Sequence, residues 1–224
     1  MRPNKDHSLD VAPADIQIIR ELSRSDASSV FEIELAGQKY AMKLFHDNGD
    51  PGIAENGRDL NRFRCELNAY LRLHQHHVCE QGFVPYFYGY IDRLDPSMLM
   101  PALQHFTHDK FHPRAILLEY LPKAESLNCE NYSETCYSQV IEGIKQIHAA
   151  GVHHQDVYPK NILELPGALP ERIVWIDFDV ATTFSTAGPD EQKLSDFEDI
   201  IAMEFGEFLV EDQRQGLPKN TKFY

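Results

Sequence analysis

Apolar and polar residues alternate in two short stretches in the first third of the chain. Residues 30–35 (VFEIEL) and 40–45 (YAMKLF) both show this pattern. A period of two is typical of half-buried strands, so it predicts a β-hairpin in which Lys43 has apolar neighbours. Residues 84–92 and 115–121 are rich in apolar and aromatic side chains and predict further strands of a β-rich region with five strands and one helix.

Helical periodicity marks the helix of this region. Leu60, Phe63 and Leu67 recur at intervals of three and four residues and predict an amphipathic helix over 58–74. Glu66 lies on that helix.

The second half of the chain combines helices with short strands. A helix is predicted over 132–150, and Gly151 stands where it would end. Residues 162–165 and 172–178 predict two strands joined by the turn-forming sequence PGALPE at 166–171.

A last helix is predicted from an S-x-x-E capping box. In such a box the side chains of Ser195 and Glu198 would bind the first free N–H groups of the helix. The apolar face that follows would consist of Phe197, Ile200, Ile201, Phe205, Phe208 and Leu209.

Composition limits the classes of partner. The 224 residues, 42% of them hydrophobic, suffice for one large domain or two modest lobes. A net charge of −14 repels nucleic-acid backbones and anionic membranes, so any phosphate site must be local. No stretch has the apolar character of a signal peptide or a membrane span, which predicts a cytoplasmic protein or, as the open alternative, a nuclear one. The four cysteines lack metal or disulfide spacing and are expected to be reduced thiols.

Several motifs supply the residue types that phosphoryl transfer requires, namely metal ligands, a cation and a carboxylate that orients the attacking hydroxyl. They occur in the order AMK (41–43), FRCEL (63–67), HQDVYPKN (154–161) and WIDFD (175–179). This ordered set resembles the protein-kinase-like superfamily over about residues 18–210. Together with GLPKNTKFY at the end of the chain, the last two motifs also resemble compact kinase-like proteins of filamentous fungi.

The resemblance implies a role for each motif. Lys43 would contact the α and β phosphates of ATP, and Glu66 would pair with this lysine. Asp156 would orient or deprotonate the acceptor hydroxyl. Asn161 and Asp177 would bind Mg²⁺, with Mn²⁺ as the alternative, through oxygen atoms.

A hinge segment is implied at LLEYLP (117–122). The backbone at Glu119 and Leu121 would meet adenine, and Leu118 would guard the pocket behind it. For the implied ion pair, Glu55 is an alternative to Glu66 as the partner of Lys43.

The implied fold is α+β and bilobal. Residues 1–121 would form an N-lobe with a small antiparallel sheet and one helix, and residues 122–224 a truncated, mainly helical C-lobe. Few residues follow Asp179, and no Ala-Pro-Glu element is present. A reduced C-lobe would leave little platform for docking a peptide substrate.

The phosphate-covering loop departs from the glycine-rich pattern. Ser23, Ser25, Ser28 and Val30 stand where the resemblance calls for three glycines and a valine. Serines make such a loop stiffer and bulkier, which should weaken nucleotide binding.

Other departures lie around the catalytic loop. Gln155 replaces an arginine that in many protein kinases pairs with a phosphorylated activation loop, and Tyr158 replaces a lysine that supports the γ-phosphate. Lys160 is a candidate replacement for that lysine. Asp179 replaces the glycine of Asp-Phe-Gly, which removes a flexible hinge beside Asp177.

The sequence favours an ATP-dependent phosphotransferase acting on a protein or small-molecule hydroxyl. The main alternative is a pseudokinase, which would bind nucleotide or act as a scaffold without turnover. A zinc site is a weaker alternative. Its candidate ligands fall into two groups: His74, His76, His77 and Cys79, and His105, His108 and His112.

Overall fold

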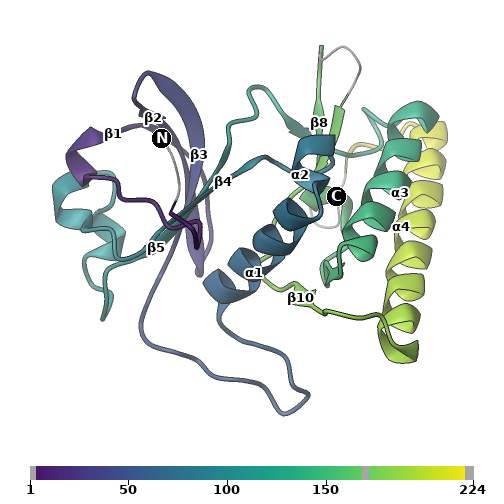
Figure 1. Cartoon of the computed structure of the whole chain (residues 1–224). Coiled ribbons are helices and arrows are strands. Elements are labelled where there is room, and N and C mark those ends of the chain that lie inside the picture. The colour runs from purple at the N-terminus through teal and green to yellow at the C-terminus, as the bar shows by residue number, and fades with distance from the viewer. Residues whose placement is uncertain (1–3, 168–171, 220–224) are drawn as a thin grey trace. The chain divides into compact units, whose positions relative to one another are not determined.

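The computed structural model describes residues 4–167 and 172–219 (Figure 1). Over these ranges the chain has a mixed α+β fold and divides into two compact units. The first unit holds the chain up to Leu67 together with Tyr86–Tyr120. The second holds Asn68–Pro85 and the chain from Leu121 onward. Most of the predicted 166–171 turn, residues 168–171, lies outside the described residues.

The first unit is built on an antiparallel sheet. Its strands lie in the order β1-β2-β3-β5-β4. Their bounds are β1 (Ile16–Arg24), β2 (Ser28–Leu35), β3 (Gln38–Phe45), β4 (Phe87–Ile91) and β5 (Arg114–Glu119). The predicted hairpin is confirmed, since β2 and β3 pair in continuous register. Ala36 and Gly37 join them at φ 51° and 78°, the left-handed conformations that a two-residue hairpin loop requires.

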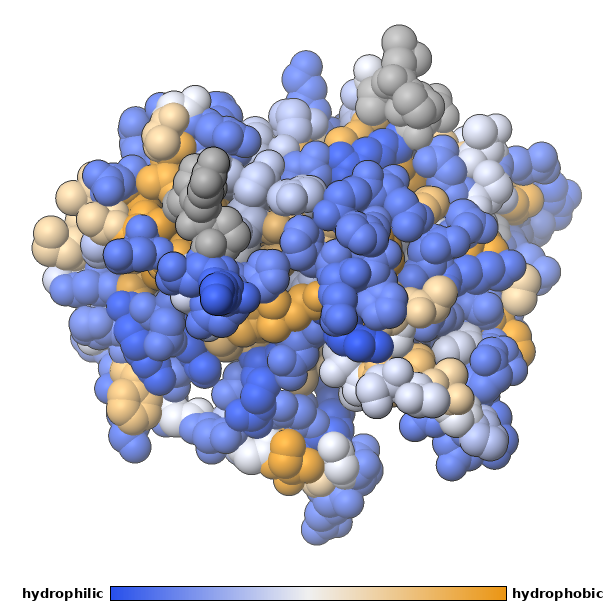
Figure 2. Space-filling model, in the orientation of Figure 1, coloured by the Kyte–Doolittle hydropathy of each residue, from blue (hydrophilic) through white to orange (hydrophobic). Residues whose placement is uncertain are grey.

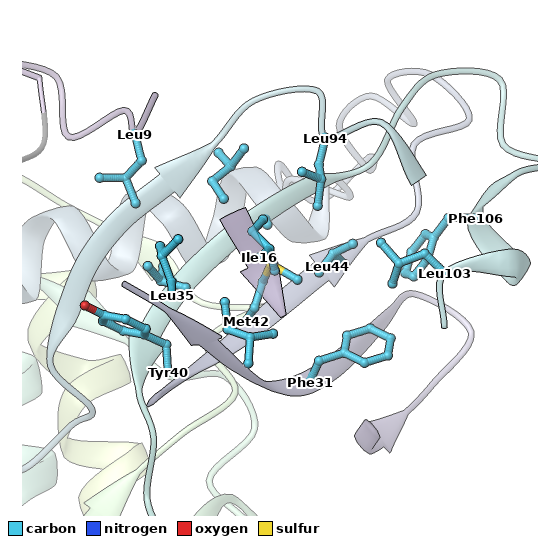
Figure 3. Packing of buried hydrophobic residues seen from close by; sticks show 14 residues of the cluster. Leu9, Ile16, Phe31, Leu35, Tyr40, Met42, Leu44, Leu94, Leu103 and Phe106 are labelled. Atoms are coloured by element: carbon cyan, nitrogen blue, oxygen red, sulfur yellow. The ribbon is translucent and has the colours of Figure 1, made fainter. Parts of the chain in front are cut away.

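Strand alternation divides the side chains of this sheet between two faces. Phe31 and Ile33 of β2 lie on the same face as Met42 of β3, and all three are buried in one hydrophobic core (Figure 3). The alternation therefore turns Lys43 to the opposite face. The other core members are Leu9, Ile16, Leu35, Tyr40, Leu44, Ile91, Leu94, Leu103, Phe106, Ala115 and Leu117.

Helix α1 (Arg62–Gln75) confirms the predicted helix but begins four residues later than expected. Its start is set by Asn61, whose Oδ1 accepts a hydrogen bond from the backbone N–H of Arg64 at 3.0 Å. An asparagine in this position satisfies a free N–H of the first turn.

The second unit combines three helices with short strands. The helices are α2 (Val78–Gln81), α3 (Glu134–Ala149) and α4 (Pro189–Gln215). Strands β7 (Val152–His153) and β10 (Thr182–Thr183) form one pair, and β6 (Glu125–Ser126), β8 (Ile162–Leu165) and β9 (Arg172–Trp175) form a second sheet. Helices α3 and α4 pack side by side (Figure 1).

The predicted capping box of the last helix is wrong. Helix α4 begins at Pro189, and Gly188 precedes it with its N–H donated to Glu191 Oε2 at 3.0 Å. Ser195 and Glu198 lie inside the helix and are buried. The predicted apolar face is also wrong, because Leu209 alone of its six residues is buried. A proline at the first helical position, followed by acidic residues, is the signal that fixes this start.

The strand predicted over 172–178 ends earlier, at Trp175. Asp177 has φ 67°, which is incompatible with an extended strand. Ending the strand here leaves the Asp177 carboxylate in a loop.

The hydrophilic surface and the state of the cysteines agree with what the composition predicts. Most of the surface visible in Figure 2 is hydrophilic, with hydrophobic residues in small patches. All four cysteines are buried free thiols, as expected. None of the helices in the described ranges has the length and apolar character needed to cross a bilayer.

Candidate active site

The first unit contains a buried ion pair between β3 and α1. Lys43 Nζ lies 2.5 Å from Glu66 Oε2, and the two side chains are only 8% and 1% exposed. Glu55, the alternative partner, is exposed in the loop before α1. Because burial removes water from both charges, this pair holds the lysine far more firmly than a surface pair would.

The serine-rich segment forms a tight turn between β1 and β2. Ser25 Oγ accepts hydrogen bonds from the N–H groups of Ala27 and Ser28 at 3.2 and 3.1 Å. Ser23, one residue before the end of β1, pairs with Val30 of β2, and Ser28 is buried. The Ser25 hydroxyl therefore uses two N–H groups that a glycine-rich loop would offer to phosphates.

The segment at the end of β5 was expected to meet adenine. Leu118 is largely buried and pairs with Ala41 of β3. The N–H of Glu119 donates to Tyr86 O at 2.9 Å, and the Glu119 carboxylate accepts from Tyr86 N at 3.1 Å. Leu121 is the residue at which the chain returns to the second unit.

In the second unit, Asp156 and Asn161 are fixed to each other. Asn161 Nδ2 donates to the backbone oxygen and to Oδ2 of Asp156, both at 2.8 Å. Residues Pro159–Asn161 form a 3-10 turn that brings the asparagine back toward the aspartate. These bonds use the amide nitrogen and so orient Oδ1 of Asn161 away from Asp156, where it can coordinate a cation.

Asp177 is brought to the same place by β8 and β9. Ile176 N donates to Asn161 O at 2.9 Å, which places Asp177 one residue beyond this contact. An amide oxygen and a carboxylate are ligands that suit Mg²⁺, which takes its remaining ligands from phosphates and water. The donor set therefore fits a divalent cation.

Two side chains differ from the arrangement of many protein kinases. The Tyr158 ring packs on Phe205 of α4, with 5.2 Å between ring centroids. Lys160 Nζ lies 3.5 Å from Asp156 Oδ2 and is half exposed. Lys160 thus supplies a positively charged side chain beside Asp156, the candidate base.

His154 connects the two candidate aspartates, a role that the sequence analysis missed. Its Nε2 donates to Ile176 O at 2.9 Å, and its Nδ1 accepts from Asp156 N at 3.3 Å. Burial lowers the pKa of His154 and outweighs the nearby carboxylates Glu198, Asp177 and Asp156. The ring therefore remains neutral, which is the form that can donate at one nitrogen and accept at the other.

Glu198 is a second residue that the sequence analysis misread. Its carboxylate accepts from the N–H groups of His154 and Gln155 at 3.0 and 2.7 Å, and Oε2 lies 2.8 Å from His148 Nε2. Burial acts to raise the pKa of Glu198, but the hydrogen bonds from His148 and the two backbone N–H groups outweigh it and lower the pKa. A charged Glu198 thus holds the loop at Gln155, whose φ is 66°.

The residue after Asp177 is fixed by packing. Phe178 is fully buried and contacts the rings of Tyr70 and His154, with centroids 5.5 and 4.7 Å apart. Asp179, in place of glycine, is half-buried.

The expected residues therefore fall into two sets. Lys43 and Glu66 meet in the first unit, with the serine turn and Leu118 on the same sheet. Asp156, Asn161 and Asp177 gather in the second unit around His154 and Ile176.

Part of the chain matches a known protein family. Residues 108–206 match the lipopolysaccharide kinase (Kdo/WaaP) family. This family is a member of the protein-kinase-like superfamily, so the resemblance to that superfamily is confirmed over the matched residues. The matched range includes Asp156, Asn161 and Asp177. The chain has no match among curated proteins.

In the part of the chain that the structure describes, no group of three or more His, Cys, Asp or Glu side chains is placed to hold a metal ion. Neither of the two histidine groups considered for zinc, both within the described residues, is therefore placed to hold it.

Proposed function

Starting from the match of residues 108–206 to a family of lipopolysaccharide kinases, we propose that the chain is an ATP-dependent phosphotransferase. It transfers the γ-phosphate to a hydroxyl group. The observation that carries this proposal is the fixed group formed by Asp156, Asn161 and Asp177 within the matched range. These residues supply the carboxylate and the metal ligands that phosphoryl transfer requires.

Asp156 acts on the acceptor in the proposed mechanism. Its carboxylate accepts the hydrogen bond of the acceptor hydroxyl, orients the oxygen for attack and takes up the proton as the new bond forms. The hydrogen bonds from Asn161 and the N–H contact to His154 hold Asp156 in place before the substrate arrives. Such preorganisation lowers the barrier because little rearrangement remains at the moment of reaction.

Charge on the phosphates is offset by cations. Asn161 and Asp177 are the proposed ligands of Mg²⁺ or Mn²⁺, and the bound ion supplies charge neutralisation at the phosphates. Lys43, oriented by Glu66, is proposed to bind the α and β phosphates. Lys160 takes over the contact to the γ-phosphate, for which Tyr158 is unsuited because it packs on Phe205.

The remaining parts of a kinase-like fold are proposed in the same way. Residues 1–121 and 122–224 are the proposed N-lobe and C-lobe. The backbone at Glu119 and Leu121 is the proposed adenine contact, with Leu118 beside it. Ser23, Ser25, Ser28 and Val30 are the proposed phosphate-covering loop.

The acceptor is proposed to be a hydroxyl of a molecule other than a protein. The matched family is named for lipopolysaccharide, which is not a protein. Phosphorylation of protein Ser or Thr is the outcome that would replace this part of the proposal.

A second candidate function is that of a pseudokinase. The observation that favours it is the turn at Ser25, whose hydroxyl already binds the N–H groups of Ala27 and Ser28. A loop whose N–H groups are already hydrogen-bonded within the turn binds phosphates weakly. A protein with such a loop would bind nucleotide without consuming it.

One experiment separates the two. The purified chain is incubated with Mg·ATP or Mn·ATP and pools of proteins and of small hydroxyl compounds, and phosphate transfer is measured. Asp156→Ala should abolish transfer while thermal shift shows unchanged ATP binding. Asp196→Ala, at an exposed position on α4, is the matched control and should transfer as wild type. Transfer by Asp156→Ala at the wild-type rate would refute the role of Asp156, and nucleotide binding without transfer by wild type would favour the pseudokinase.

A further inference from the structure

The second unit contains a cavity of about 360 Å³ that the proposed reaction does not use. Its walls come from the ends of α1 and α3, from the chain after β10, and from the start of α4. Asp156, Asn161 and Asp177 are absent from the lining.

The cavity is lined by cations in a chain that is strongly acidic. Arg72 and Lys145 face it, and neither forms an ion pair with a carboxylate of the described residues. The one carboxylate in the lining is Asp199, whose Oδ1 lies 3.1 Å from His148 Nδ1. Because the chain as a whole has a net charge of −14, this local excess of positive charge can attract an anion that the rest of the surface repels.

The guanidinium of Arg72 is held in place but is incompletely hydrogen-bonded. Its Nη2 donates to Phe184 O at 2.9 Å, and its Nε is buried without an acceptor among the described residues. Gly151, at φ 79°, leaves the space that the guanidinium occupies, since a Cβ there would lie 2.7 Å from Nη2. A buried charged donor without an acceptor is rare in proteins, and it leaves Arg72 short of the acceptor oxygens that an anionic ligand supplies.

We propose that this cavity binds a small phosphate monoester. Arg72 and Lys145, which both line the cavity, bind the phosphate oxygens. The volume exceeds what a phosphate group fills, and Phe184 lines one wall, so the ligand carries an organic part that packs there.

Isothermal titration of the full chain, at constant ionic strength, tests the proposal. The probes are phenyl phosphate, inorganic phosphate and benzoate. Wild type should bind phenyl phosphate most tightly, inorganic phosphate more weakly, and benzoate at least about tenfold more weakly than phenyl phosphate, because a phosphate offers more acceptor oxygens and more charge.

Paired variants locate the binding site. Lys145→Ala removes an exposed lysine of the lining and should weaken phenyl phosphate binding about tenfold. Lys193→Ala removes another exposed lysine, from α4 outside the lining, and should change phenyl phosphate binding by less than about twofold. Asp177→Asn, which alters the proposed metal site, should also bind phenyl phosphate as wild type, so that failure here is distinguishable from failure of the proposed kinase activity.

Three results would overturn the proposal. The first is that wild type shows no saturable binding of phenyl phosphate. The second is that Lys145→Ala and Lys193→Ala lose affinity for phenyl phosphate equally. The third is that benzoate binds as tightly as phenyl phosphate.

Discussion

Glu198 offers a way to perturb the catalytic loop without changing a residue proposed to contact substrate. Its carboxylate is almost fully buried and accepts from two backbone N–H groups and from His148. Glutamine has nearly the same shape as glutamate. The replacement Glu198→Gln therefore tests the charge and the acceptor count rather than the packing.

The expected magnitude follows from these contacts. Glutamine keeps one acceptor oxygen, and its NH₂ group would face N–H donors at 2.7–3.0 Å. Hydrogen bonds to a charged group contribute about 1.5–3 kcal/mol each, and a buried donor left without a partner costs about 1–3 kcal/mol. We therefore expect Glu198→Gln to lower the free energy of unfolding by about 3 kcal/mol.

Urea unfolding followed by fluorescence measures this loss. Trp175 is the single tryptophan of the chain and is buried in the second unit, so its emission reports on the unit that contains Glu198. Glu207→Gln makes the same chemical change at an exposed position of α4 and should alter the free energy of unfolding by less than about 0.5 kcal/mol.

Acid pH provides a second view of the same carboxylate. The pKa of Glu198 is lower in the folded protein than in the unfolded chain. Its contribution to the free energy of unfolding is therefore complete above the pKa of the unfolded chain, and it is lost as pH falls through the pKa of the folded protein. At neutral pH the full difference should be seen. A Glu198→Gln protein as stable as Glu207→Gln at neutral pH would refute the reasoning.

Three further predictions concern other parts of the candidate site. Burial lowers the pKa of both His153 and His154, so the unfolded chain takes up protons at a higher pH than the folded protein; the free energy of unfolding should therefore fall as pH is lowered through about 6.5, and a rise on acidification would contradict this. Ser25→Gly frees two backbone N–H groups and should tighten Mg·ATP binding about threefold in a titration, whereas unchanged or weaker binding would show that the turn does not limit it. Lys160→Met should lower the rate of phosphate transfer at least about tenfold with little change in ATP affinity. The control is Lys110→Met in the first unit, and equal rates in the two variants would remove Lys160 from the mechanism.

The main elements could be predicted because their patterns are local. The hairpin of β2 and β3 follows from period-two alternation, and α3 follows from helical periodicity closed by Gly151. The motifs at 154–161 and 175–179 lie in the range that matches a kinase family, and their spacing along the chain was enough to indicate the superfamily.

Contacts that join distant segments could not be predicted. Glu198 and Ser195 match a capping box, and nothing in the local sequence shows that they turn inward to bind residues some 40 positions earlier. The hydrogen bonds of His154 depend in the same way on where β9 brings Ile176. Burial overrode the local preference at α4, where a wide apolar stripe faces outward and small or polar residues face inward.

The central claim is that this chain moves phosphate from ATP to an alcohol, and phosphorus NMR of the reaction mixture tests it most directly. With Mg·ATP and an acceptor pool, wild type should produce ADP together with a phosphomonoester resonance distinct from that of inorganic phosphate, and Asp156→Ala should produce neither. ADP formation no faster in wild type than in Asp156→Ala, under conditions where both are saturated with ATP, would contradict it.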